Sequence, residues 1–365
     1  MMRWFLLLSL VACVDGGTPS EFLIYDVDPA LGEYRMMRAR IDTLEDPHRG
    51  IGTVAEVRGG GSMVIKNADP QTEAEWQEAF VLDGDAAPDI QWALRDNGVA
   101  MPLDFDSAMM LTLYHHLERA SEYFDGIGVP LTAVRRLPVY YATNLEVTIF
   151  FLPVPLLSDN AAYVMNVDAF LIPPRNILDD VPLFANRGVM IHEYSHAVFN
   201  RLVHGDTRAP AYLLEDWPPA VMNEMRSLDE GAADFFAASA VDNSDFLSAS
   251  IPEEFDIDRD LAAERHYDDE VRWSVTNDDI LSYDPYQLGS VIASTLWALR
   301  ADVDHATLAK AVVAALDSTA PVDTFTVVAF FDSVVDELPV AIRTDACLLF
   351  AERLDVVAVE LTCLF

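Results

Sequence analysis

RGVMIHEYSHAVFNRL, residues 187–202, contains the pattern H-E-x-x-H at positions 192–196. The apolar residues on both sides of this pattern predict a mostly buried helix. Residues four apart on a helix lie on one face, so His192 and His196 can offer imidazole nitrogens to one metal ion. Glu193 lies one step around the helix, where its carboxylate can take a proton from a water molecule beside the metal. Two histidines and a glutamate in an apolar helix need a partner, which favours a zinc site over an ordinary polar helix face.

A catalytic zinc needs a third protein ligand, and two glutamates downstream are candidates. Glu215 follows His196 with eighteen residues between them, but the prolines of LLEDWPP predict a loop there. Glu230 lies in SLDEGAADFFAAS, where small and apolar residues favour a close-packed helix. We favour Glu230, because a ligand needs a rigid support. Asp234 then lies one turn further along the same face, where it can hold the outer nitrogen of a zinc histidine.

HEYSHAVFNRL followed by DEGAADFFA resembles the glutamate-zincin metallopeptidases, most closely the fungalysin family and more distantly thermolysin. The resemblance implies His192, His196 and Glu230 as zinc ligands, Glu193 as general base and Asp234 as the carboxylate behind a ligand. It also implies an α+β fold with two lobes, a β-containing N-terminal lobe that carries the H-E-x-x-H helix and a mainly helical C-terminal lobe. The close resemblance covers roughly residues 105–300.

A third block, beginning YQLG at residues 286–289, is similar to the family's later active-site helix. In fungalysin-like enzymes a histidine three residues before the glycine helps to stabilise the oxyanion, whereas this chain has Tyr286 at that position. A tyrosine hydroxyl can also donate to a developing oxyanion, so Tyr286 is the candidate. Tyr283 and His266 are alternative donors.

An alternating stretch that ends at Phe170 predicts a strand, and Asn160 and Ala161 lie near its beginning. In thermolysin-like enzymes an Asn-Ala pair on an edge strand hydrogen-bonds the substrate backbone. An extended peptide that adds to a sheet edge would present its scissile bond in this way. Asn160 and Ala161 are therefore candidates for substrate binding, and the alternative is a plain turn before a core strand.

The first twenty residues predict an export signal and a tether. A short positive start precedes an apolar run too short to span a bilayer, and the run ends in LVAC, which looks like a bacterial lipobox. Lipidation of Cys13 would anchor the protein at a membrane, facing the periplasm or the cell exterior, with VDGGTPS as a polar tether. An ordinary secretory signal is the alternative. In an exported protein Cys347 and Cys363, sixteen residues apart, could pair in a disulfide.

The chain has 365 residues, 60 acidic against 23 basic, and a net charge of −37. Such a surface repels nucleic acid and anionic headgroups, so we expect no nucleic-acid partner, and membrane contact only through the lipid. We expect a monomer. Acidic clusters at residues 253–260 and 268–270 are candidates for calcium, but they lack an EF-hand loop, and a solvated charge run is the better interpretation.

Turn-forming residues and changes in composition along the chain predict four regions. These are the signal and tether at 1–20, a mixed or β region at 21–100, the zinc-binding lobe at 101–245 and a mainly helical lobe at 246–365. In the second region, strand-like segments flank Gly59–Gly61 in a predicted hairpin. A helix is expected from Asp106, with His115 and His116 as structural residues. Further helices are expected at 286–301, 305–316, 324–336 and 342–353.

The sequence thus predicts an exported zinc metalloendopeptidase that acts on peptides or proteins. An aminopeptidase is an alternative within enzymes. The alternative from another class is a non-catalytic, zinc-containing surface protein, which the tyrosine at position 286 would suit.

Overall fold

The computed structural model describes residues 19–28, 30–67, 70–84, 86–129, 136–149, 152–155, 161–174, 181–205, 207–250, 259–280, 282–356 and 361. Cys13, Asn160, Cys363 and the acidic segment 253–258 lie outside these residues, and so do the predictions made for them. Cys347 is disulfide-bonded. None of the helices in the described ranges combines the length and the apolar character that a membrane span requires.

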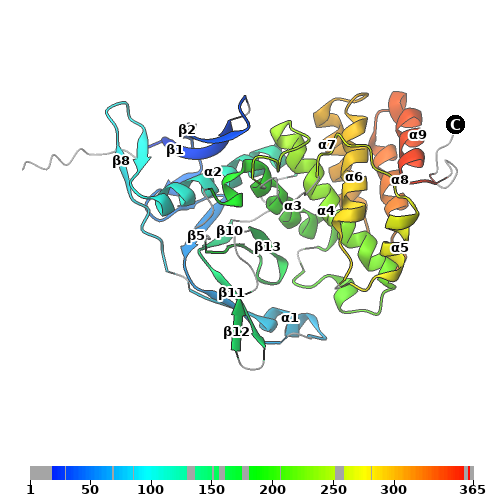
Figure 1. Cartoon of the computed structure of the whole chain (residues 1–365), viewed down its shortest axis with the longest axis horizontal. Helices are drawn as coiled ribbons and strands as arrows, with labels where there is room; N and C mark the ends of the chain where they lie inside the picture. Colours follow the sequence, from blue (N-terminus) through cyan, green and yellow to red (C-terminus); the bar gives the residue numbers. More distant parts are fainter. Residues whose placement is uncertain are drawn as a thin grey trace, which may run out of the picture.

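The fold is α+β, with the described strands confined to the first half of the chain (Figure 1). The strands are β1 Glu21–Asp28, β2 Glu33–Arg40, β3 Leu44–Asp46, β4 Ile51–Gly52, β5 Ala55–Gly59, β6 Ser62–Ile65, β7 Phe80–Asp83, β8 Trp92–Leu94, β9 Ala100–Pro102, β10 Leu137–Tyr141, β11 Asn144–Ile149, β12 Leu152–Pro155, β13 Ala162–Val164 and β14 Ala169–Ile172. They form three sheets in the orders β2-β1-β9-β8, β13-β14-β10-β5-β4-β3 and β12-β11-β6-β7. Strand β13 therefore lies at an edge of the six-stranded sheet.

The hairpin predicted across Gly59–Gly61 is wrong. Strand β5 pairs with β10 and β4, while β6 pairs with β11 and β7, so the two strands belong to different sheets. Gly60 and Gly61 have φ of 60° and 120°, a region that favours glycine and lets the chain bend from one sheet into the next. The segment that follows the paired strand β10 bends at the same level, at Ala142 with φ of 56°. A hydrogen bond from Gly60 N to Tyr141 O joins the two bends. Glycines at a bend and at a hairpin give the same sequence signal.

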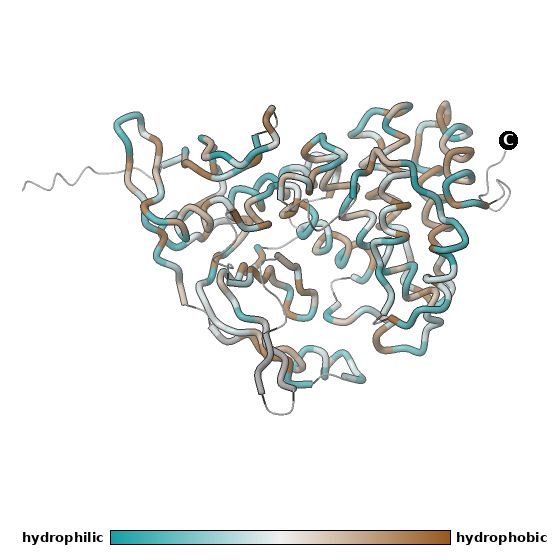
Figure 2. The backbone as a smooth tube through the Cα atoms, viewed as in Figure 1, coloured by the Kyte–Doolittle hydropathy of each residue, from teal (hydrophilic) through white to brown (hydrophobic). Residues whose placement is uncertain are grey.

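The helices are α1 Glu73–Ala79, α2 Phe105–Gly126, α3 Arg187–Val203, α4 Pro219–Val241, α5 Asp269–Asn277, α6 Tyr286–Leu299, α7 His305–Ser318, α8 Val327–Glu337 and α9 Arg343–Arg353. The helices expected from Asp106 and in the last eighty residues are present, whereas α5 was not anticipated. Asp268 begins α5, since its side chain accepts hydrogen bonds from the amides of Glu270 and Val271. Hydrophobic positions recur along the helices, and the connecting loops are largely hydrophilic (Figure 2).

Helices α4 and α6 touch through their backbones. A Cβ atom at Gly231 would lie 2.6 Å from the carbonyl oxygen of Gly289, and one at Gly289 would lie 3.3 Å from Cβ of Glu230. A side chain at Gly231 would force the two helices apart, and one at Gly289 would fit only tightly. The contact places the beginning of α6 beside Glu230. One large apolar cluster joins these helices to the sheets, from Phe22 in β1 to Phe350 in α9.

Candidate metal centre

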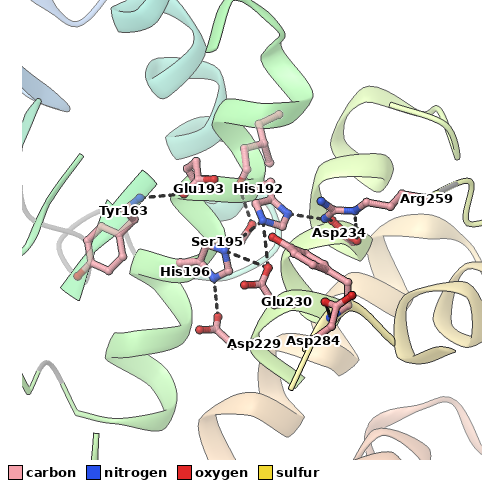
Figure 3. Close-up of polar contacts among 12 residues, drawn as sticks. Tyr163, His192, Glu193, Ser195, His196, Asp229, Glu230, Asp234, Arg259 and Asp284 are labelled. Atoms are coloured by element: carbon pink, nitrogen blue, oxygen red, sulfur yellow. Dashed lines mark hydrogen bonds and ion pairs between the residues drawn. The ribbon is translucent and has the colours of Figure 1, made fainter. Parts of the chain in front are cut away.

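Two helices bring the predicted zinc ligands together (Figure 3). Asn186 begins α3 by accepting a hydrogen bond from the amide of Gly188, and Pro219 occupies the first turn of α4. The Nε2 atoms of His192 and His196 lie 3.1 Å apart. Oε2 of Glu230, from the middle of α4, lies 3.3 Å from the first of these nitrogens and 3.6 Å from the second.

The outer nitrogens of both imidazoles face carboxylates. Nδ1 of His192 lies 2.9 Å from Oδ1 of Asp234, and Nδ1 of His196 lies 2.7 Å from Oδ1 of Asp229. A carboxylate at Nδ1 fixes the proton there, so the neutral imidazole exposes a lone pair at Nε2. Two lone pairs and the buried Oε2 of Glu230, which makes no hydrogen bond within the described residues, thus converge on one point.

This donor set fits a divalent metal. Bonds of about 2.0–2.2 Å in a tetrahedron separate neighbouring ligand atoms by roughly 3.3–3.5 Å. The three separations among His192, His196 and Glu230 span 3.1 to 3.6 Å. Atoms of His192, Glu193 and His196 also lie within 4.8 Å of one another, so the Glu193 carboxylate could complete a group instead. The shorter separations favour Glu230 as ligand and leave Glu193 beside the metal.

Glu193 is held by the edge strand of the six-stranded sheet. Its Oε2 accepts a hydrogen bond of 2.8 Å from the backbone amide of Tyr163 in β13. The Tyr163 hydroxyl donates to Asp168, and Arg201, two turns after Glu193 on α3, also binds Asp168. These contacts fix the strand to the helix. Burial raises the pKa of Glu193 above its ordinary value, against the opposing effect of His192 and His196.

The ligand residues shift one another's pKa in the directions expected of a charged cluster. Burial would lower the pKa of His196, but the charges of Asp229 and Glu230 outweigh it and raise the pKa to about 10. Burial would raise the pKa of Glu230, but His196 and His192 lower it to about 2. Four carboxylates thus surround two histidines, beside one partly buried arginine among the described residues. Such an excess of negative charge suits a bound cation.

The partly buried arginine is Arg259. It binds both carboxylate oxygens of Asp234, with Nε 3.1 Å from Oδ2 and Nη2 in contact with Oδ1. Its guanidinium also lies over the ring of Tyr286, 4.1 Å from the ring centre. Tyr286 is the first residue of α6, and its amide is bound by Asp284. Burial raises the pKa of Tyr286 well above its ordinary value, and Glu230 raises it further, so the phenol keeps its proton.

A second phenol, Tyr212, is influenced by the same carboxylates. Burial raises its pKa, and the charges of Asp229 and Glu230 add to this effect. Tyr212 belongs to the 3-10 turn Ala211–Leu213 in the segment that connects α3 to α4.

The other candidates lie elsewhere or have other partners. Glu215 accepts a hydrogen bond from the indole of Trp217. Tyr283 is buried and bonds Ser227, while His266 is exposed and pairs with Glu264. Ala161 is buried one residue before β13.

Sequence reasoning missed two residues of the site, Asp229 and Arg259. Asp229 precedes Glu230 and could have been inferred from the helix, since residues 229 and 230 both face α3. Arg259 follows an acidic segment, and only the tertiary structure brings it to Asp234. Comparison with known proteins assigns no family, because no protein family and no curated protein matches the chain.

Proposed function

We propose that the protein is a zinc metallopeptidase that hydrolyses internal peptide bonds. The observation that carries the proposal is the convergence of three ligand atoms beside a glutamate that is not itself needed as a ligand. His192, His196 and Glu230 would hold the zinc, with Asp234 and Asp229 fixing the two imidazoles. When bound, zinc would polarise the scissile carbonyl and lower the pKa of a water molecule.

Glu193 would act as the general base. It would take the proton of the attacking water and pass it to the leaving amine. Its raised pKa brings it closer to neutrality, where a residue that accepts and then returns a proton works best. The Tyr163 amide binds one carboxylate oxygen and leaves the other free to face the water.

Tyr286 would donate a hydrogen bond to the oxyanion. The phenol is protonated at neutral pH because burial raises its pKa, and Arg259 stacks on the ring and limits its movement. A hydroxyl held beforehand at the position where charge develops stabilises the transition state without reorganisation. Tyr286 would thus replace the histidine of the family that the sequence resembles.

The proposal includes a thermolysin-like arrangement of two lobes, with the zinc helix at the junction of the β-rich and helical halves. Among the described residues the strands end at Ile172 and the large helices follow it, with α2 as the exception. Export and lipid attachment at Cys13 also belong to the proposal. The disulfide bond of Cys347 supports an oxidising compartment outside the cytoplasm.

The decisive experiment compares wild type with Glu193→Gln on a peptide library blocked at the N-terminus. We expect the variant to bind one equivalent of zinc and to lose roughly 100- to 10,000-fold in kcat/KM. Glu224→Gln is the matched control, because the Glu224 carboxylate also accepts a backbone amide, that of Val327 at 2.7 Å. The control should cleave at the wild-type rate.

Equal activity of wild type and Glu193→Gln would exclude the mechanism. Cleavage of free but not blocked peptides would identify an aminopeptidase instead. Zinc bound at one equivalent without cleavage of any peptide would favour the non-catalytic surface protein.

A further inference from the structure

The edge strand β13 passes directly beside the general base. The amide of Tyr163 points away from the sheet and lies 2.8 Å from Oε2 of Glu193. On its other side β13 pairs with β14, so the edge that faces Glu193 is the outer one. An extended peptide whose scissile bond lies at Glu193 would therefore run along this edge and follow the strand in both directions.

A pocket lies where β13 ends. The strand continues into the 3-10 turn Met165–Val167, and two residues of this turn line a pocket of ≈ 500 Å³. The lining residues are Gln77, Phe80, Leu82, Asn166, Val167 and Arg208. Phe80, Leu82 and Val167 also pack on a small apolar cluster that includes Met63 and Leu171. The pocket therefore presents mainly polar surface, with two amides and one cation, beside this apolar cluster.

Arg208 is the charged residue among those that line the pocket, and its backbone is fixed from two sides. The Arg208 amide donates to Oε1 of Glu73 at 2.8 Å, and Nδ2 of Asn166 donates to the Arg208 carbonyl at 3.1 Å. The hydroxyl of Thr207 donates to the other oxygen of Glu73. Contacts between residues far apart in the sequence thus hold Arg208 at the rim of the pocket.

The guanidinium of Arg208 is only weakly paired. Its Nη1 lies 3.4 Å from the Met165 carbonyl and 3.8 Å from Oδ2 of Asp168. Arg201 binds the same aspartate more closely, at 2.8 Å. Since a guanidinium has five N–H donors, Arg208 can still bind a carboxylate with two of them.

We propose that this pocket is a substrate subsite for a glutamate or aspartate side chain on the N-terminal side of the scissile bond. The inference rests on the proposed peptidase function. Asn166 and Val167 lie in the 3-10 turn that follows Val164, the last residue of the strand, so the pocket lies beyond the C-terminal end of β13. Antiparallel pairing, the commoner arrangement, places this end of β13 opposite the N-terminal part of the substrate. Alternate side chains of that peptide would point to the face where the pocket lies.

The subsite would favour an acidic substrate residue although the overall charge of the protein repels acidic peptides. A net charge of −37 repels acidic peptides, so a preference for an acidic residue at one position requires a local cation. Arg208 supplies this cation at the pocket.

The test uses the zinc-loaded full chain and peptides blocked at both ends, with Glu or Gln placed at each of five positions on either side of the scissile bond. We expect kcat/KM to be about tenfold higher for Glu than for Gln at one of the N-terminal positions, as for a hydrogen-bonded charge. Arg208→Met should remove this preference, so that the Glu and Gln peptides are cleaved at equal rates. Arg136→Met is the matched control, because Arg136 is a surface arginine paired with Glu56 at 3.3 Å, and it should keep the preference.

Equal rates with Glu and Gln at every N-terminal position, a preference only on the C-terminal side, or a preference that survives in Arg208→Met would overturn the subsite. In each of these cases the peptides are still cleaved, so the proposed function stands. Absence of cleavage of every peptide by wild type would instead overturn the proposed function, and the subsite with it.

Discussion

Two buried histidine pairs lie on neighbouring helices, His115 and His116 on α2 and His192 and His196 on α3. Burial lowers the pKa of the α2 pair to about 3, because no carboxylate hydrogen-bonds either ring. Nε2 of His116 lies 2.9 Å from the Ala185 carbonyl, and Nδ1 of each ring has no hydrogen bond within the described residues. In the α3 pair, carboxylates outweigh burial and raise the pKa of both rings.

The difference shows what would allow buried histidines to hold a metal. Adjacent residues on a helix point about 100° apart, so the α2 rings cannot converge, whereas residues four apart can. Each pair also has an aspartate and an arginine nearby, Asp26 with Arg187 at 3.6 Å and Asp234 with Arg259. Asp234 reaches a ring nitrogen at 2.9 Å. Spacing and aimed carboxylates, rather than burial, distinguish the two regions.

The largest expected effect is a difference in zinc affinity between variants of the two histidine pairs. His196→Ala should lose zinc affinity by more than the ~10–100-fold that loss of an outer partner costs. His116→Gln should keep one equivalent of zinc, because a glutamine amide can still donate to the Ala185 carbonyl. Elemental analysis after dialysis and competition with a chelator measure both variants. Loss of zinc from His116→Gln would break the comparison.

The second effect is a difference in zinc affinity between variants of Asp234 and Asp26. Asp234→Asn should lower zinc affinity about 10–100-fold, since it weakens the hydrogen bond that orients the His192 ring. Asp26→Asn should leave zinc affinity unchanged, because the charge of Asp26 acts near His115 and Arg187. The same chelator titration applies. Equal losses in the two variants would mean that general destabilisation, and not ring orientation, controls affinity.

The third effect is the pH dependence of stability in the metal-free protein. The folded pKa of the α2 histidines is about 3, below the ordinary 6.5, so the unfolded chain binds more protons between these values. The free energy of unfolding should therefore fall as pH decreases from 6.5 toward 3, by up to about 1.4 kcal/mol per pH unit and histidine. His196, with a folded pKa of about 10, contributes stability that is complete below 6.5 and is lost as pH rises toward 10.

Urea unfolding across this pH range measures the fall of the unfolding free energy on the acid side, the acid limb, and on the alkaline side, the alkaline limb. His116→Gln should flatten the acid limb relative to wild type, and His196→Ala the alkaline limb. A flattened acid limb in His196→Ala would contradict the assignment.

The smallest effect concerns the arginine of the site. Arg259→Lys keeps a positive charge at Asp234 but removes the planar contact with Tyr286. We expect a loss of about 1 kcal/mol, or roughly fivefold in kcat/KM, with zinc retained. Arg300→Lys is the control, because Arg300 also lies over an aromatic ring, that of Trp297 at 3.9 Å, and pairs with Asp242. A loss of similar size in the control would remove any special role for Arg259.

The parts of the site that sequence could predict are those within one helix. Spacing placed His192, Glu193 and His196 together, and the helix periodicity placed Asp234 one turn after Glu230. Asp229 was missed although it adjoins Glu230 on the same helix, because it is one of 60 acidic residues. Arg259 and the amide of Tyr163 were missed because their partners come from distant segments, and a backbone amide carries no signal in the sequence.

The fold shows the same division. The long amphipathic helices were predicted because periodicity is a local property, while the pairing of β5 and β6 with different sheets depends on β10 and β11, some eighty residues away. The three glycines marked the turning point correctly, but not the direction of the chain beyond it.

The backbone contact between Gly231 and Gly289 has a mechanical consequence. With no side chain between them, α4 and α6 cannot slide apart or rotate without losing contact along their length, so Glu230 and Tyr286 must move as one body. On the opposite wall, β13 is joined to α3 by the bond from the Tyr163 amide to Glu193 and by the bond from Arg201 to the Tyr163 hydroxyl. Both walls of the proposed metal centre are therefore braced, so widening it to admit a bulky chain would break hydrogen bonds between β13 and α3.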